Sequence, residues 1–235
     1  MDTFHTTSFE GGFYDYQGIS ELTCPNGWVP RWVQGTVPGH NHRPEYDAKD
    51  KDRGQPEVRS GRFAANFFTV HATHDACLWA KFTVGAGRGV RASVWCMSVT
   101  RDKDGSDGGH GMQIGIDPTG GTDHTAESVL YGDWWSSYMR DVQDWGDRAW
   151  QERVWHQVTV DAVSQGDEIT VFLHAKCDFP VDINASHWDD LVLEVGRPDE
   201  VKPPEKRKDK PIGDLTLEQL EQIIRRVIQE EQAHP

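Results

Sequence analysis

The chain has 235 residues, of which 38 are Asp or Glu and 24 are Lys or Arg, so its formal net charge at pH 7 is −14. Such acidity argues against a protein that binds nucleic-acid phosphates or an anionic membrane surface, because both need clustered Lys and Arg. Ten Trp and nine Phe residues supply enough apolar surface for a genuine core, which argues against disorder for most of the chain.

The sequence shows neither a recognisable targeting signal nor a cysteine motif. No stretch approaches the run of about 20 apolar residues that spans a bilayer, so we expect no membrane span. The N-terminus, Met1–His5, has no basic region followed by an apolar one, so no secretory signal peptide is visible. The four cysteines are scattered without a Cys-x-x-Cys pair, which disfavours a zinc site made of cysteines alone. We expect them to be free, buried thiols at strand positions.

The main body of the chain alternates apolar and polar residues with the period of two that is typical of β-strands. The segments expected to be strands are 77–84, 90–97, 158–162, 169–176 and 191–195. No helical pattern lies between these segments, so the strands are expected to pair in an antiparallel way. A two-sheet sandwich is the economical way to bury one face of every strand. The sequence therefore predicts an all-β, antiparallel β-sandwich.

The chain changes character after residue 196. Residues 197–213 are charged and rich in proline, which is typical of a solvated linker. Residues 214–235 place apolar side chains at the spacing of one helical face and so predict an amphipathic helix. Because so short a helix is marginal alone in water, we expect it to form a homo-oligomer or dock on a partner. The alternative is that it packs back on its own chain.

Several short motifs resemble galactose-binding-like jelly-roll carbohydrate-binding modules. They are Ser8–Phe13, Pro25–Trp28, Ser60–Ala64, Gly115–Asp123 and His187–Leu193. The resemblance covers about residues 8–195 and leaves out an insertion-like stretch around 38–58, as well as the linker and the helix. It implies that residues 1–196 form a jelly roll that binds glycans without catalysis, and that 115–123 is a loop.

A structural calcium ion is often present near the chain ends in this family, held by an acid of the opening motif and an acid of the closing one. The matching positions are Glu10 and Asp189 or Asp190. Calcium takes six to eight oxygen ligands, and an ion there would tie the first strand to the last. The alternative is that Glu10 is a surface acid and Asp190 forms an end-of-strand turn.

The tryptophans are too many to be explained by the core alone. We expect Trp28 and Trp188 to pack inside, whereas strand alternation puts Trp79 and Trp95 on outer faces. The same alternation points Phe172 and His174 outward. An exposed indole suits glycan binding, because the apolar C–H face of a sugar ring can stack on it while nearby acids and amides pair with the hydroxyls.

The densest aromatic cluster, at 131–138, falls between strands and is expected to be a loop, where binding residues concentrate. The alternative is a lid whose tryptophans cover an edge of the sandwich. The predicted carbohydrate-binding residues are Trp79, Trp95, Asp133, Trp134, Trp135, Tyr138 and Trp145.

Histidine is plentiful, with eleven residues, and forms two near-neighbour pairs at 40–42 and 71–74. Either pair could hold zinc together with an acid such as Glu45 or Asp75. No third and fourth ligand is close in sequence, so we interpret these histidines as scattered surface residues.

Catalysis is poorly supported by the sequence. It contains no nucleophile elbow, no phosphate-cradling loop and no HExxH motif, and with 38 acids it selects no glycosidase pair. We therefore expect noncatalytic, lectin-like recognition of a surface glycan or polysaccharide. The alternative is a structural virion or extracellular-assembly component, such as a phage decoration or receptor-binding protein. It would use the sandwich for display and the C-terminal helix as its anchor. Both hypotheses place the protein outside the cell or on a virion surface.

Overall fold

The computed structural model of the chain describes residues 1–35, 41–100, 110–136, 154–177, 179–180 and 182–204. Within these residues the secondary structure consists of β-strands and three short 3-10 helices. No helix in the described ranges is long and apolar enough to cross a membrane.

The first sheet, within the described residues, has six strands in the order β12-β8-β14-β6-β5, with β1 also paired to β14. All of these pairings are antiparallel. The long strand β14 pairs along one edge with β8, and along its other edge first with β6 and then with β1. The strands are β1 (Asp2–Thr7), β5 (Glu45–Asp50), β6 (Phe63–Thr69), β8 (Gly89–Thr100), β12 (His156–Val163) and β14 (Asn184–Gly196).

The second sheet also has six strands in the described part of the chain, in the order β10-β9-β13-β7-β4, with β11 paired to β9. Its pairings are likewise antiparallel. The strands are β4 (Val29–Trp32), β7 (His74–Thr83), β9 (His110–Asp117), β10 (Leu130–Tyr131), β11 (Trp135–Ser136) and β13 (Glu168–Cys177). A separate hairpin joins β2 (Phe13–Asp15) to β3 (Thr23–Pro25).

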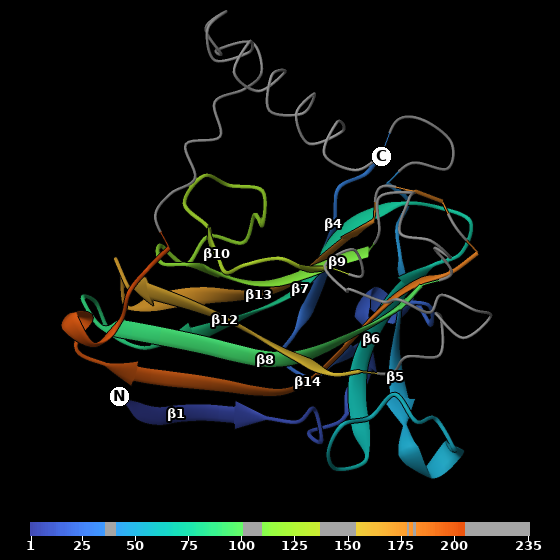
Figure 1. Cartoon of the computed structure of the whole chain (residues 1–235), viewed down its shortest axis with the longest axis horizontal. Coiled ribbons are helices and arrows are strands. Elements are labelled where there is room, and N and C mark those ends of the chain that lie inside the picture. The colour runs from blue at the N-terminus through green and yellow to red at the C-terminus, as the bar shows by residue number, and fades with distance from the viewer. Residues whose placement is uncertain (36–40, 101–109, 137–153, 178, 181, 205–235) are drawn as a thin grey trace, which may run out of the picture. The chain divides into compact units, whose positions relative to one another are not determined.

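The two sheets enclose one hydrophobic core and so form a β-sandwich (Figure 1). From β6 onward the chain repeatedly crosses from one sheet to the other. Alternate residues of β8, β12 and β14 meet alternate residues of β7, β9 and β13 between the layers. The Tyr46 hydroxyl of the first sheet donates to the carbonyls of Arg31 and Cys77 in the second, at 3.1 Å each. The two sheets are therefore held together by burial of apolar side chains and by the hydrogen bonds of the buried Tyr46 hydroxyl.

The five strands predicted from alternation are all present, as β7, β8, β12, β13 and β14. Their apolar positions are the ones that fill the core, and Trp28 and Trp188 lie there too, at 4% and 0% exposed. The all-β prediction is confirmed for the described residues. All four cysteines are free and buried, as expected.

Two segments differ from the sequence interpretation. The segment resembling a loop at 115–123 begins inside strand β9, and the loop itself starts after Asp117. The insertion-like stretch at 38–58 contains the edge strand β5 and the 3-10 helix Lys51–Arg53. These strands escape the alternation test because glycines or charged residues occupy their outward positions.

The C-terminal end of the described chain lies on the sandwich. Contacts divide the chain into one unit at Met1–Pro204 and another at Glu205–Pro235. The start of the predicted linker belongs to the first unit, because Pro198–Glu200 forms a 3-10 helix and the backbone N–H of Lys202 donates to Asp161 at 2.8 Å. The amphipathic helix predicted at 214–235 lies outside the described residues.

Candidate functional site

The outer face of the second sheet carries the densest group of polar and aromatic side chains in register. Its strands bring Gln113 of β9, His174 of β13 and Cys77 of β7 into one row across the sheet. The next row places Phe172 beside Trp79. All of these positions alternate with core residues and therefore point away from the core.

Two glycines of β9 make room for aromatic rings on this outer face. A Cβ at Gly115 would lie 2.5 Å from Cε1 of Tyr131, and one at Gly111 would lie 2.9 Å from Cε3 of Trp134. Any side chain at these positions would displace the rings. Tyr131 and Trp134 therefore lie close over the backbone of β9, and each ring centroid is within about 5.3 Å of the His174 ring, at 5.2 and 5.3 Å.

Three side chains from distant parts of the sequence converge beside these rings. Asp75 of β7 accepts hydrogen bonds on its Oδ1 from Nε2 of His174 at 2.9 Å and from Nε2 of His124 at 3.1 Å. His174 comes from β13, and His124 comes from the loop that follows β9. Antiparallel pairing of β7 with β13 supplies two of the three residues, and the loop folds over the sheet to supply the third. We refer to Asp75, His124 and His174 as the Asp-His-His cluster.

Burial sets the charge state of the Asp-His-His cluster. Burial lowers the pKa of His174, although the neighbouring Asp75 carboxylate acts to raise it. Burial alone would raise the pKa of Asp75, but the N–H donors of the two histidines outweigh it and bring the pKa below its ordinary value. At neutral pH the cluster thus holds an ionised carboxylate next to a neutral His174 imidazole.

Neighbouring groups fix the positions of the cluster. The amide of Gln113 hydrogen-bonds to Nδ1 of His174 at 2.9 Å, and the Tyr131 hydroxyl donates to the carbonyl of His124 at 2.7 Å. At the rim of the same face Arg31 forms an ion pair of 3.1 Å with Asp123, in which the side chains are 41% and 50% exposed. This face therefore combines rigid buried polar groups with accessible polar groups around them.

The predicted carbohydrate-binding residues do not all lie together. Trp79 and Trp134 share the outer face of the second sheet, and both are half-buried. Trp95 lies on the outer face of the first sheet, where the Arg59 guanidinium covers its ring at 3.9 Å. Trp135 packs against the core instead and stacks on His156 at 4.4 Å. The Trp134 ring lies against Gly111 on the outer face, whereas Trp135 pairs with the core residue Met112, so the two adjacent indoles point to opposite sides of the sheet.

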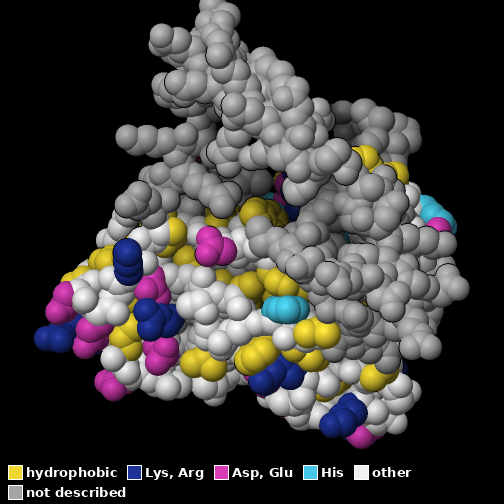
Figure 2. Space-filling view, viewed as in Figure 1, with side chains coloured by type: hydrophobic (Ala, Val, Ile, Leu, Met, Phe, Trp, Pro, Cys, Tyr) yellow, Lys and Arg dark blue, Asp and Glu magenta, His cyan; other side chains and the backbone are white. Residues whose placement is uncertain are grey.

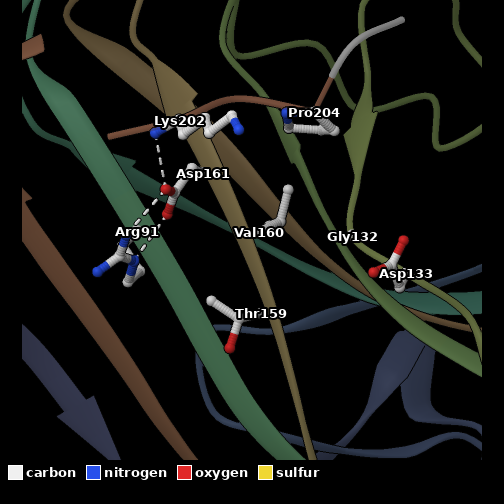
Figure 3. Close-up of a pocket in the computed structure, with 8 residues that line it drawn as sticks. All are labelled: Arg91, Gly132, Asp133, Thr159, Val160, Asp161, Lys202 and Pro204. Atoms are coloured by element: carbon white, nitrogen blue, oxygen red, sulfur yellow. Dashed lines mark hydrogen bonds and ion pairs between the residues drawn. The ribbon is translucent and has the colours of Figure 1, made fainter. Parts of the chain in front are cut away.

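Asp133 lies at a separate, open pocket of about 440 Å³ where the β10–β11 turn meets the edge strand β12 (Figure 3). Across the pocket, Asp161 accepts two hydrogen bonds from Arg91 at 2.8 and 2.9 Å. The backbone N–H of Lys202 also points to Asp161 (Figure 3). This acid is thus already paired, and none of the described residues that line the pocket is aromatic. Tyr138 and Trp145 lie outside the described residues.

The three acids predicted to bind calcium hold a loop through hydrogen bonds. Glu10 Oε1 accepts from the backbone N–H groups of Arg62 and Phe63, both at 2.8 Å. Asp189 Oδ2 accepts from the N–H groups of Arg59 and Ser60 at 2.9 and 3.0 Å. These contacts fasten the segment before β6 to the sandwich.

Asp190 completes this anchor. It hydrogen-bonds to the Ser60 hydroxyl at 2.5 Å and pairs with the Arg59 guanidinium. Burial, with a further contribution from Asp190, raises the pKa of Asp189 to about 7, against the effect of its N–H donors. In the structure these three acids are paired with backbone N–H groups and with the Arg59 guanidinium. Calcium binding at these acids stays a prediction.

Of the histidines interpreted as surface residues, His71 is exposed but His74 is buried, which corrects that interpretation for His74. His74 and His110 are both 0% exposed, and their rings meet edge to face at 5.4 Å inside the sandwich. His124 and His174 are 2% and 6% exposed. The sequence hypothesis paired Asp75 with His71 and His74, whereas the structure pairs it with His124 and His174. Only the outward prediction for His174 pointed toward this cluster, because its partners His124 and Asp75 lie 50 and 99 residues earlier in the chain.

Comparison with protein-family models and with curated proteins finds no match. Solved structures with a similar fold include TmCBM61 in complex with β-1,4-galactotriose, at 12% identity and a TM-score of 0.43, covering 72% of this chain and 88% of that one. The K1 cleaved adhesin domain of Lys-gingipain from Porphyromonas gingivalis W83 has 12% identity and a TM-score of 0.48, covering 81% and 96%.

A third similar structure is the CBM22-1 xylan-binding domain from Paenibacillus barcinonensis Xyn10C, at 12% identity and a TM-score of 0.44, covering 83% of this chain and 96% of that one. These three structures are two carbohydrate-binding modules and one adhesin domain. At such low identity and TM-scores, the ligand of this chain has to be argued from its own residues.

Proposed function

We propose that the protein is a noncatalytic carbohydrate-binding module that holds glycans on the outer face of its second sheet. The observation that carries this proposal is the pair of half-buried indoles, Trp79 and Trp134, on the same sheet face as the Asp-His-His cluster. Indole presents a flat apolar surface to the C–H face of a pyranose, and half-burial keeps the ring in place while leaving part of it accessible.

Polar groups on the same face suit sugar hydroxyls. The Asp75 side chain is 21% exposed and can accept a hydrogen bond, while the half-exposed Arg31 and Asp123 offer a donor and an acceptor at the rim. Ligand sites of this kind combine apolar walls with a few fixed polar groups. The finer points, a lectin-like role and a location outside the cell or on a virion, belong to the same proposal.

The test measures retention of the full-length protein in native gels that contain soluble galactans, xylans, glucans or mannans. Trp79→Ala and Trp134→Ala should each weaken retention by about tenfold in affinity, the equivalent of about 1.4 kcal/mol, because each removes one stacking surface. The matched control is Trp95→Ala, which removes an indole from the outer face of the other sheet and should leave retention unchanged.

Two outcomes would count against the proposal. One is a parent protein that no polysaccharide of the panel retards. The other is loss of retention in Trp95→Ala with Trp79→Ala and Trp134→Ala unaffected, which would move the site to the first sheet. Thermal melting of each variant separates lost binding from lost folding.

The structural-assembly alternative stays a prediction, because its anchoring helix at 214–235 lies outside the described residues. Calcium at Glu10, Asp189 and Asp190 stays a prediction as well. Melting the protein with and without EDTA tests it, since a cation joining these acids would raise the melting temperature.

A further inference from the structure

The Asp-His-His cluster has the composition and the convergence of a transition-metal site. The ligand-capable atoms of Asp75, His124 and His174 all lie within 4.8 Å of one another. Both imidazoles direct Nε2, and not a ring carbon, toward the same carboxylate oxygen. One small displacement of each side chain would place all three atoms around a single ion.

The electrostatics of the cluster favour a cation. It is buried except for the partly exposed Asp75 carboxylate, with His124 and His174 at 2% and 6% exposed. The Asp75 carboxylate supplies a negative charge beside two imidazole nitrogens, a set that suits a divalent cation.

The ligand types select among metals. Imidazole nitrogen suits Zn²⁺, Cu²⁺, Ni²⁺ and Fe²⁺, whereas Ca²⁺ and Mg²⁺ take oxygen ligands. We propose that Asp75, His124 and His174 bind a first-row divalent cation of the Zn²⁺ class on the outer face of the second sheet. Three protein ligands leave one position of a tetrahedral ion open, on the side where Asp75 reaches solvent. Water or a hydroxyl of a bound molecule would fill that position.

Gln113 would orient the metal-bound imidazole. When Nε2 of His174 binds an ion, its Nδ1 carries the proton and needs an acceptor. The Gln113 side chain lies 2.9 Å from this Nδ1, and a rotation of its amide by 180° exchanges nitrogen for oxygen at nearly the same position. Hydrogen-bond acceptors behind a metal-bound histidine raise its basicity, and losing one typically costs about 10–100-fold in metal affinity.

The experiment titrates Zn²⁺ into the full-length protein, after chelator treatment and dialysis, in competition with a chromophoric chelator. We expect one tight site per chain in the parent and in His71→Ala, which removes an exposed histidine outside the cluster. His124→Ala should weaken this site by at least the 10–100-fold that loss of a supporting acceptor costs. Co²⁺ in place of Zn²⁺ should give visible d–d absorption in the parent that is lost in His124→Ala.

Equal Zn²⁺ affinity in the parent and in His124→Ala, or no tight site in either, would overturn the proposal and leave the cluster as a hydrogen-bonded support. If His124→Ala fails to fold, the Zn²⁺ affinity of Gln113→Glu is compared with that of the parent, because this variant retains all three proposed ligands. A carboxylate behind His174 should tighten Zn²⁺ binding, and an unchanged affinity would contradict the proposal.

This inference is independent of the proposed glycan binding. Trp79→Ala should lose polysaccharide retention while its Zn²⁺ affinity stays that of the parent, because Trp79 is not one of the three ligands. The two proposals can therefore fail separately.

Discussion

Buried histidines give the sandwich a dependence on pH at the scale of single residues. His110 is 0% exposed and lies between the hydroxyls of Ser98 at 2.8 Å and Ser186 at 2.9 Å. Burial lowers its pKa from 6.5 to about 3. Between these values the unfolded chain binds a proton at this residue and the folded chain does not, so stability is lost as the pH falls.

The loss at His110 can be measured by urea unfolding at pH 6.5 and pH 5. At about 1.36 kcal/mol per pH unit, His110 should contribute about 2 kcal/mol to the decrease in unfolding free energy. His110→Gln should show a decrease that is smaller by this amount, while His71→Gln, at an exposed position, should follow the parent. Identical decreases in all three proteins would contradict a buried, neutral His110.

Gly115 controls how Tyr131 lies on the outer face of the second sheet. A methyl group at this position would meet the Tyr131 ring at 2.5 Å, and the ring is held by its hydrogen bond to His124. Gly115→Ala should therefore destabilise the protein by about 1–3 kcal/mol, as overpacking typically does. Gly166→Ala is the control, since a Cβ there has nothing within 4 Å. Chemical denaturation measures the unfolding free energy of both variants. Equal values would show that the Tyr131 ring can move aside without cost, which would contradict the prediction.

At the scale of elements, the bulge in β14 anchors the segment that leads into β6. Asp189 accepts N–H groups on both of its carboxylate oxygens, from Arg59 and Ser60 on one and from Asp190 on the other. Asp189→Asn would replace one of these oxygens by an amide NH₂ group, which would then face a backbone N–H donor. It should cost about 1–3 kcal/mol of unfolding free energy, the penalty for a buried unsatisfied group.

Asp190→Asn is the matched control for this anchor. Asp190 has a φ of 49°, a left-handed conformation that Asn tolerates well, and its side chain is partly exposed. Loss of its ion pair with Arg59 should cost less than about 1 kcal/mol. An Asp189→Asn variant as stable as Asp190→Asn would refute the anchoring role.

Strands with clean alternation, such as β13, could be predicted from the sequence, whereas β9 could not. Strand β13 alternates without interruption, so both its core residues and the outward position of His174 follow from the pattern. Strand β9 hides its alternation, because Gly111, Gln113 and Gly115 sit between its core residues. Those residues are small or polar because aromatic rings and the cluster cover them.

The cluster itself could not be predicted, because its members meet only through tertiary structure. His174 and Asp75 are 99 residues apart, and His124 and Asp75 are 49 apart. Their meeting depends on the register of β13 with β7 and on the path of the loop after β9. Inspection of a sequence finds zinc motifs whose ligands are closely spaced, and it therefore misses a site whose ligands are this far apart.

At the scale of the whole molecule, the chain carries a formal charge of −14. Acidic and basic side chains alternate over the described part of the face shown in Figure 2. Two outer faces remain as candidates for ligand binding. On the first sheet the Arg59 guanidinium already stacks on Trp95, whereas on the second sheet Trp79 and Trp134 flank fixed polar groups. The second sheet is therefore the binding face in this account.

The most direct test follows the indole N–H signals of the full-length protein by ¹⁵N–¹H NMR while a polysaccharide that retards it in the gel is added. Single Trp→Phe variants assign the signals. The account predicts that the signals of Trp79 and Trp134 shift or broaden while those of Trp95 and the core Trp188 stay in place. A ligand that shifts the Trp95 signal and leaves Trp79 and Trp134 unchanged would contradict it.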